Sequence, residues 1–267
     1  MNTANNTTRN INRIQPTPHQ DWAQKFWDGL VPDKNKIVQH VYFEELGRGD
    51  LSIERARRGL IDFYPLVENF PKYMALNLAK TRPGTSPGHH EAKFWLMQNM
   101  KIEQKHADWW CDWAECIRLS RQELYQAKPS ALMDAINNFL WYVNTYGSLS
   151  EGIAATNLAV EWATGEWTVR ILSGVKSYAE RGLADISQQT MSWLNAHATY
   201  DDVHPYEAME LIKLCAVTED DQNRSFAASK RAMEYYMLAL DDCYEPYRSS
   251  LAGQNGVLYS HARNGVL

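Results

Sequence analysis

The fold class can be inferred from the residues Ile153-Ala-Ala-Thr-Asn-Leu-Ala-Val-Glu161-Trp-Ala163. The apolar residues of this stretch recur three and four positions apart without period-two alternation, which predicts a helix over 151–177 rather than a strand. The residues flanking Glu161 are small and apolar, a setting in which an unpaired carboxylate is unfavourable. The stretch therefore predicts a buried helix whose carboxylate at position 161 has a partner or a ligand.

The same helical periodicity covers most of the chain on both sides of this stretch. Helices are predicted over 21–47, 52–81, 89–118, 129–148, 151–177, 184–214 and 218–246. Residues 82–88 form a clear loop, and Ser120 with Glu123 matches a capping box. Pro65 and Pro71 predict a kink or a split in the second helix. The pattern predicts an all-α protein, a compact bundle of about seven helices, and such bundles hold metal sites between facing helices.

Two end segments differ from this pattern. Residues 1–20 are polar and lack periodicity, which predicts a disordered or loosely attached leader. Residues 249–267 are similar and are expected to form a flexible C-terminal tail. No linker rich in proline and glycine divides the middle, so we expect one helical domain over 21–248.

Composition excludes several classes of partner. The formal net charge is -5 and no basic stripe is present, which argues against a nucleic-acid partner. No window approaches 18 uninterrupted apolar residues, so no membrane span is expected. The four cysteines form no CxxC pair or disulfide framework, and no apolar signal-peptide core is found. We therefore expect a cytoplasmic protein with reduced thiols.

The run His197-Ala-Thr-Tyr-Asp201-Asp-Val-His204 has the spacing of metal ligands. Offsets of four and seven residues fall within about 60° of one another on a helix, so the three side chains share one stripe. Two imidazoles and a carboxylate form a typical ligand set for iron. Surface pairs along a helix are the alternative interpretation. Pro205 follows directly and predicts a bend at this site.

Two other helices supply further candidate ligands. Glu103 and His106 form an i, i+3 pair of the Glu-x-x-His type used in di-iron bundles. Taken alone, that pair could be solvent-facing, and Glu161 could instead form a salt bridge with an arginine such as Arg170. The combination gives a candidate ligand set for two metal ions: Glu103, His106, Glu161, His197, Asp201 and His204. Structural zinc would favour four closed ligands, usually including cysteine.

Four stretches also carry a family resemblance. They are residues 73–82, 95–109, 153–167 and 193–212. Here the chain resembles the haem-oxygenase-like di-metal oxidases of the thiaminase II (TenA) and PQQ-biosynthesis-C-like superfamily. Within that group it is most similar to UndA-type decarboxylases, which convert medium-chain fatty acids to terminal alkenes. The resemblance implies a seven-helix fold holding non-haem iron. The ligands that it implies are Glu103, His106, Glu161 and His197, with Asp201 and His204 completing the set.

The resemblance implies an O2-dependent non-haem di-iron oxidase. The expected reaction is oxidative C–C cleavage, decarboxylation or desaturation of a small carboxylate substrate, either a medium-chain fatty acid or an amino-acid-derived metabolite. Two iron ions or a mixed manganese–iron pair, O2 as co-substrate, an external electron donor with its reductase, and a homodimer are also implied. The leader and residues 120–150 show little likeness, and in such folds these parts help to form the wall of the substrate cavity. The alternatives are a metal-free TenA-type thiaminase II (aminopyrimidine hydrolase), which uses a cysteine nucleophile, and a non-catalytic metal-binding helical protein.

Overall fold

The computed structural model of the protein describes residues 14–200 and 203–244. Within these ranges the chain is helical and contains no strand, which confirms the predicted all-α class. The elements are α1 (Asp21–Val38), α2 (Val41–Arg48), α3 (Ile53–Lys80), α4 (His89–Glu103), α5 (His106–Cys116), α6 (Arg121–Gln126), α7 (Ala131–Tyr146), α8 (Leu149–Ile153), the π-helix η1 (Ala154–Val160), α9 (Glu161–Glu180), α10 (Ser192–Tyr200), α11 (His204–Cys215) and α12 (Glu219–Tyr244).

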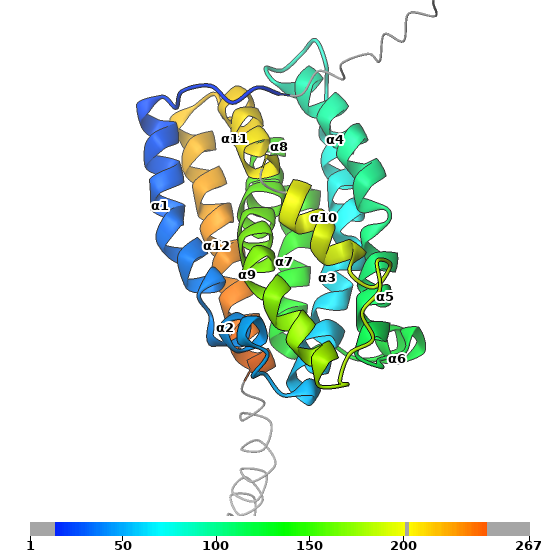
Figure 1. The fold of residues 1–267 in the computed structure, drawn as a ribbon. Coiled ribbons are helices and arrows are strands. Elements are labelled where there is room, and N and C mark those ends of the chain that lie inside the picture. Colours follow the sequence, from blue (N-terminus) through cyan, green and yellow to red (C-terminus); the bar gives the residue numbers. More distant parts are fainter. Residues whose placement is uncertain (1–13, 201–202, 245–267) are drawn as a thin grey trace, which may run out of the picture.

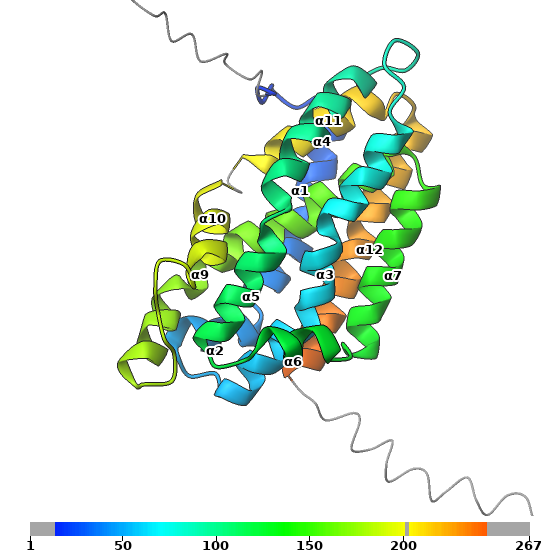
Figure 2. The same cartoon turned by 90° about the vertical axis from the view of Figure 1, so that its right-hand side faces the viewer.

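A continuous rod made of α8, η1 and α9 runs through the middle of the bundle (Figure 1). Helices α1 and α12 pack along one side of this rod, and α3 and α7 pack on another side, with α4 and α5 against α3 (Figures 1 and 2). Helix α11 packs on η1, and α10 packs on α9. The rod is thereby enclosed, as the apolar stretch around Glu161 predicts.

Small side chains explain how so many helices reach the rod. Ala154, Ala155 and Ala159 of η1 are fully buried. Because a methyl side chain adds little width, α11 and α12 approach the backbone of η1 closely.

Three of the predicted helices are interrupted. The helix predicted over 21–47 ends at Val38, and His40 then caps α2 by accepting a hydrogen bond from the backbone of Tyr42. The helix predicted over 89–118 is broken after Glu103 and restarts at His106. In the segment 184–214, α10 begins only at Ser192, and a second helix, α11, starts at His204.

Some of the predictions from proline and capping residues are confirmed and others are not. Helix α3 passes through Pro65 and Pro71 without dividing, because each proline removes only one backbone donor from a long helix that is packed on its neighbours. The capping box of Ser120 and Glu123 is confirmed, and it begins α6, a helix that was not predicted. Pro205 lies in the first turn of α11, so the bend expected at this position takes the form of a new helix start.

The segment from Ile14 to Gln20 lies against α11. Thr17 donates to Glu210 through both its backbone N–H (2.8 Å) and its hydroxyl (2.8 Å). Lys213 donates to the backbone oxygens of Thr17 and Pro18. The remainder of the expected leader (1–13) and the expected tail (249–267) lie outside the described residues. None of the described helices is both long enough and apolar enough to cross a bilayer.

Candidate metal centre

Five of the six predicted ligands come together inside the bundle. Glu103 is the last residue of α4 and His106 the first of α5, Glu161 begins α9, His197 lies on α10 and His204 begins α11. All five are buried, with exposed fractions between 3% and 7%. Ionisable side chains are buried at a large energetic cost unless they are paired or bind an ion, so this gathering requires an explanation. The sixth predicted ligand, Asp201, lies outside the described residues.

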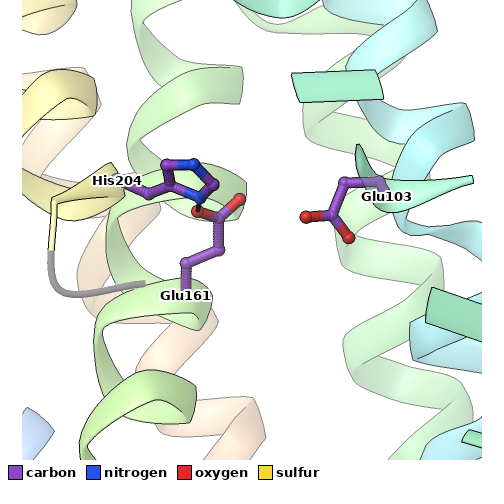
Figure 3. Close-up of side chains that lie close together, drawn as sticks. All are labelled: Glu103, Glu161 and His204. Carbon is purple, nitrogen blue, oxygen red and sulfur yellow. Dashed lines mark ion pairs between the residues drawn. The ribbon is translucent and has the colours of Figure 1, made fainter. Parts of the chain in front are cut away.

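The first group consists of Glu103, Glu161 and His204. Each offers one ligand atom, and these atoms all lie within 4.8 Å of one another. Nδ1 of His204 is 3.3 Å from Oε2 of Glu161. Figure 3 shows the carboxylate of Glu103 facing these two side chains from the opposite helix.

The second group consists of Glu103, His106 and His197. Nδ1 of His106 lies 2.6 Å from Oε2 of Glu103. The approach is not aligned for a hydrogen bond, and neither ring nitrogen of His106 has a hydrogen-bond partner in the described part of the chain. The rings of His106 and His197 have centroids 4.5 Å apart. Glu103 therefore belongs to both groups and joins them.

The protonation state of His197 suits a metal ligand. Burial lowers the pKa of His197 well below its ordinary value, and the nearby rings of His106 and His204 lower it further. The ring is then neutral near pH 7, which is the form that binds a metal. Nδ1 of His197 is 2.9 Å from the carbonyl oxygen of Trp193, so this nitrogen donates and Nε2 keeps its lone pair.

Glu161 is held on one side by an amide. Nδ2 of Asn157 donates to its Oε1 atom over 2.7 Å. Burial raises the pKa of Glu161, while the adjacent imidazole of His204 lowers it. Arg170 is exposed and does not pair with this carboxylate in the described structure, so the interpretation as a buried salt bridge to Arg170 is wrong.

Breaks between helices determine where the ligands lie, whereas the sequence predicted ligands on continuous helices. His197 and His204 do not share one stripe of a single helix, because the chain changes from α10 to α11 between them. Glu103 and His106 also belong to different helices. The residues at the i, i+3 and i, i+7 spacings are therefore brought together by breaks between helices and not by a shared face of one helix.

A cavity opens beside the two groups. Its polar lining residues are Glu103, His106, Glu161, Thr164, His197 and Tyr236. Its apolar lining residues are Phe63, Leu66, Val67, Phe70, Trp110, Val160, Trp167 and Trp193. The lining contains no lysine or arginine, so the cavity is apolar except at the ligands and at one pair of hydroxyls.

Two further polar residues near the ligands were not predicted. Glu207, one turn after His204, is buried and accepts a hydrogen bond of 2.7 Å from the indole N–H of Trp95. Asn157 is fully buried in η1. Their offsets of three and four residues from candidate ligands were the available signal, but a carboxylate or amide in a helix is common and carries little weight alone.

The residues present fit iron or manganese. Imidazole and carboxylate ligands suit these ions, whereas structural zinc favours a closed tetrahedral set, usually with cysteine. Oε2 of Glu161 and Nδ1 of His106 are buried and have no hydrogen-bond partner in the described residues. Such atoms are rare in proteins, and an ion bound in each group would satisfy them.

Comparisons with known proteins agree with this fold and this type of site. The haem-oxygenase-like family described as iron-containing redox enzymes matches residues 57–237. No curated protein matches the sequence at a significant level.

Solved structures share this fold. A TenA homologue from Pseudomonas syringae pv. tomato is 32% identical, with a TM-score of 0.79 over 87% of this chain and 99% of that one. A protein of unknown function with a haem-oxygenase-like fold from Shewanella denitrificans is 17% identical, with a TM-score of 0.69 over 86% and 95% of the two chains. A candidate TenA-like thiaminase from Sulfolobus solfataricus is 14% identical, with a TM-score of 0.59 over 84% and 98%. The last two likenesses concern the fold alone.

The family match covers most of the chain, including Glu103, His106, Glu161, His197 and His204. The chain therefore belongs to the haem-oxygenase-like family of iron-containing redox enzymes, and its structural neighbours are TenA-like.

Proposed function

We propose that the protein is an O2-dependent non-haem oxidase that holds two iron ions, or a mixed manganese–iron pair, and acts on a small carboxylate substrate. The observation that carries the proposal is the buried group Glu103, Glu161 and His204, together with His106, which contacts Glu103, and His197, which lies beside His106; four of these five residues line one cavity. Glu103, Glu161 and His204 would hold one ion, and Glu103, His106 and His197 the other. Asp201 remains a predicted ligand.

The bound metal would supply the O2 activation and one-electron chemistry that amino-acid side chains lack. The protein's own part is to bind, orient and keep water out. The aromatic and aliphatic walls, among them Phe63, Phe70 and Trp110, would exclude water and contact an apolar chain. Because no lysine or arginine lines the cavity, a substrate carboxylate has no cationic side chain to bind there, and its polar end is expected at the ligand groups.

The proposed reaction is oxidative decarboxylation, another C–C cleavage or desaturation. The resemblance to UndA-type fatty acid decarboxylases supports a medium-chain fatty acid, and the apolar lining agrees with that class. An amino-acid-derived carboxylate is the second substrate class that we propose to test. An external electron donor with its reductase, a homodimer and a cytoplasmic location complete the proposal.

The metal-free thiaminase II reaction requires an activated cysteine. None of the four cysteines lines the cavity. Burial raises the pKa of Cys215 to about 12, and it also raises the pKa values of Cys111, Cys116 and Cys243. Protonated thiols are poor nucleophiles, so these surroundings argue against the thiaminase alternative.

Metal content and O2 uptake test the proposal. The chain is reconstituted with Fe(II) under anaerobic conditions, desalted, assayed for iron and then mixed with O2 and dodecanoate. We expect about two irons per chain in the wild type, and the loss of at least one in Glu161→Ala and in His197→Ala. Glu234→Gln, a change on the exposed face of α12, is the matched control and should retain full iron content.

Two results would overturn the proposal. One is a wild-type protein that takes up no iron, and the other is full iron content in both ligand variants. If iron binds but neither fatty acids nor amino acids accelerate O2 consumption, a non-catalytic metal-binding protein is the better description.

A further inference from the structure

We propose that Asn157 is a positioning residue that fixes the carboxylate of Glu161 so that only one of its oxygens is available to a metal ion. The inference rests on the proposed metal centre and adds to it a residue that binds no metal itself. Nδ2 of Asn157 lies 2.7 Å from Oε1 of Glu161, and both side chains are buried.

The two carboxylate oxygens have different surroundings. Oε1 of Glu161 is occupied by the amide N–H of Asn157. Oε2 has no hydrogen-bond partner in the described structure and lies 3.3 Å from Nδ1 of His204. Because an amide N–H can only donate, Asn157 selects the rotation of the carboxylate that leaves Oε2 facing the other ligands.

The backbone that carries Asn157 is unusual and is held from two sides. Asn157 lies in the π-helix η1, and π-helical turns are rare and often occur at functional sites. From α7, Nδ2 of Asn144 donates to the hydroxyl of Thr156 over 2.8 Å. From α12, the hydroxyl of Ser229 donates to the carbonyl of Ala154 over 3.0 Å. The amide is therefore fixed relative to the bundle as well as to its own helix.

A second contact shows how closely this region is fitted. Asn77 of α3 donates to Oδ1 of Asn144 over 2.7 Å. A Cβ atom on Gly152 would clash with Oδ1 of Asn77, so the absence of a side chain at Gly152 lets the amides of α3 and α7 reach the rod. The amide chain from Asn77 to Thr156 thus fixes the turn that presents Asn157.

Stability alone does not account for an asparagine here. Oδ1 of Asn157 is buried and has no hydrogen-bond partner among the described residues. An unpaired buried carbonyl is unfavourable, and a leucine of similar size would avoid that cost among the apolar neighbours of η1. The contact that an asparagine makes and a leucine cannot is the donation to Glu161.

Cobalt binding provides a test that does not depend on turnover. Co(II) is titrated into the wild-type protein and into Asn157→Leu, Asn157→Ala, Glu161→Gln and Asn137→Leu, and its affinity and visible absorption band are measured. Asn137→Leu is the matched control, because Asn137 is a buried amide that bonds to Tyr73 and Met133 and not to a ligand. Circular dichroism verifies that each variant is folded, and the alanine variant replaces the leucine variant if the latter is not.

We expect the Asn157 variants to bind Co(II) roughly 10- to 100-fold more weakly than the wild type, with a shifted band, as is usual when a residue that orients a ligand is removed. Asn137→Leu should retain both the affinity and the band. Wild-type affinity and an unchanged band in a folded Asn157 variant would overturn this inference alone, provided that Glu161→Gln binds weakly. If the wild type does not bind Co(II), or if Glu161→Gln binds as the wild type does, the proposed metal centre itself fails.

Discussion

At the scale of single residues, a short chain of donors lies in the cavity wall. The indole N–H of Trp167 donates to the hydroxyl of Tyr236 over 2.8 Å, and that hydroxyl lies 3.2 Å from the hydroxyl of Thr164. The hydrogen bond between the two hydroxyls uses the proton of one of them. The proton of the other hydroxyl can therefore be donated to another acceptor. Thr164 is one turn beyond Glu161 on α9, which places this donor close to the ligands.

The donor chain predicts a role in substrate binding. Thr164→Val keeps the shape of the side chain and removes its hydroxyl. We expect KM for an oxygen-bearing substrate to rise by roughly two- to tenfold, corresponding to a lost hydrogen bond of about 0.5–1.5 kcal/mol, with little change in Tm. Steady-state O2 consumption measures this.

Thr168→Val is the control for this prediction. Thr168 donates to the backbone of Thr164 and does not line the cavity, so its replacement should leave KM unchanged. Equal KM values in the wild type and in Thr164→Val would show that the substrate does not use this donor.

At the scale of elements, α11 connects the candidate site to the N-terminal segment. His204 starts this helix, and Glu210 and Lys213 on its later turns bind Thr17. Burial raises the pKa of Glu210, but the hydrogen bonds from Lys213 and Thr17 outweigh burial, so the folded-state pKa lies below the ordinary value of 4.5.

This lowered pKa predicts a pH dependence of stability. A carboxyl group whose pKa is lower in the folded state stabilises the protein above its unfolded pKa, and this contribution is lost as pH falls through the folded pKa. We expect Glu210→Gln to be less stable than the wild type at pH 7, and the difference to shrink as the pH falls through the folded-state pKa, which lies below 4.5. Urea unfolding between pH 7 and pH 3 measures it, with Glu234→Gln as the control. A difference that is as large at pH 3 as at pH 7 would contradict the assignment.

At the scale of the whole molecule, a cluster of aromatic rings packs against the candidate metal centre. Trp193 stacks on His197 with ring centroids 3.7 Å apart, and its other neighbours are Trp110, Trp113 and Trp167. These rings come from α5, α9 and α10, so the cluster joins three helices around one ligand. Its packing contributes to the stability of the entire bundle.

Trp193→Phe separates packing from metal binding. The indole N–H of Trp193 has no hydrogen-bond partner in the described residues, so its removal should reduce packing only. We expect a loss of about 1–3 kcal/mol in the free energy of unfolding. Iron content should be retained, because His197 binds the backbone carbonyl at position 193, which the variant keeps.

Chemical denaturation and iron analysis of the same preparations test both parts. Trp22→Phe, at a half-buried position on α1, is the control and should change the free energy of unfolding less. Unchanged stability in Trp193→Phe would contradict the proposed role of the cluster.

The helices themselves and the identity of most site residues could be predicted from local patterns. Periodicity identified the helical segments. The spacing of Glu103 with His106 and of His197 with His204, the apolar flank of Glu161 and the family resemblance identified these five site residues. The breaks at Gln104 and Lys105 and between α10 and α11, as well as the π-helical turn before Glu161, could not be predicted. A spacing of three, four or seven residues has the same appearance whether the helix continues or stops, and nothing in residues 154–160 marks an i→i+5 turn.

The all-α class and the ligand types therefore follow from local sequence, because both depend on side-chain chemistry and on contacts a few residues apart. The grouping of the ligands instead depends on how the helices pack. Glu103 joins the two groups, Asn157 holds Glu161, and the cavity lies beside them because α3, α4, α5, α9, α10 and α11 pack together. These contacts connect residues far apart in the chain, and their geometry arises from the packing of the bundle.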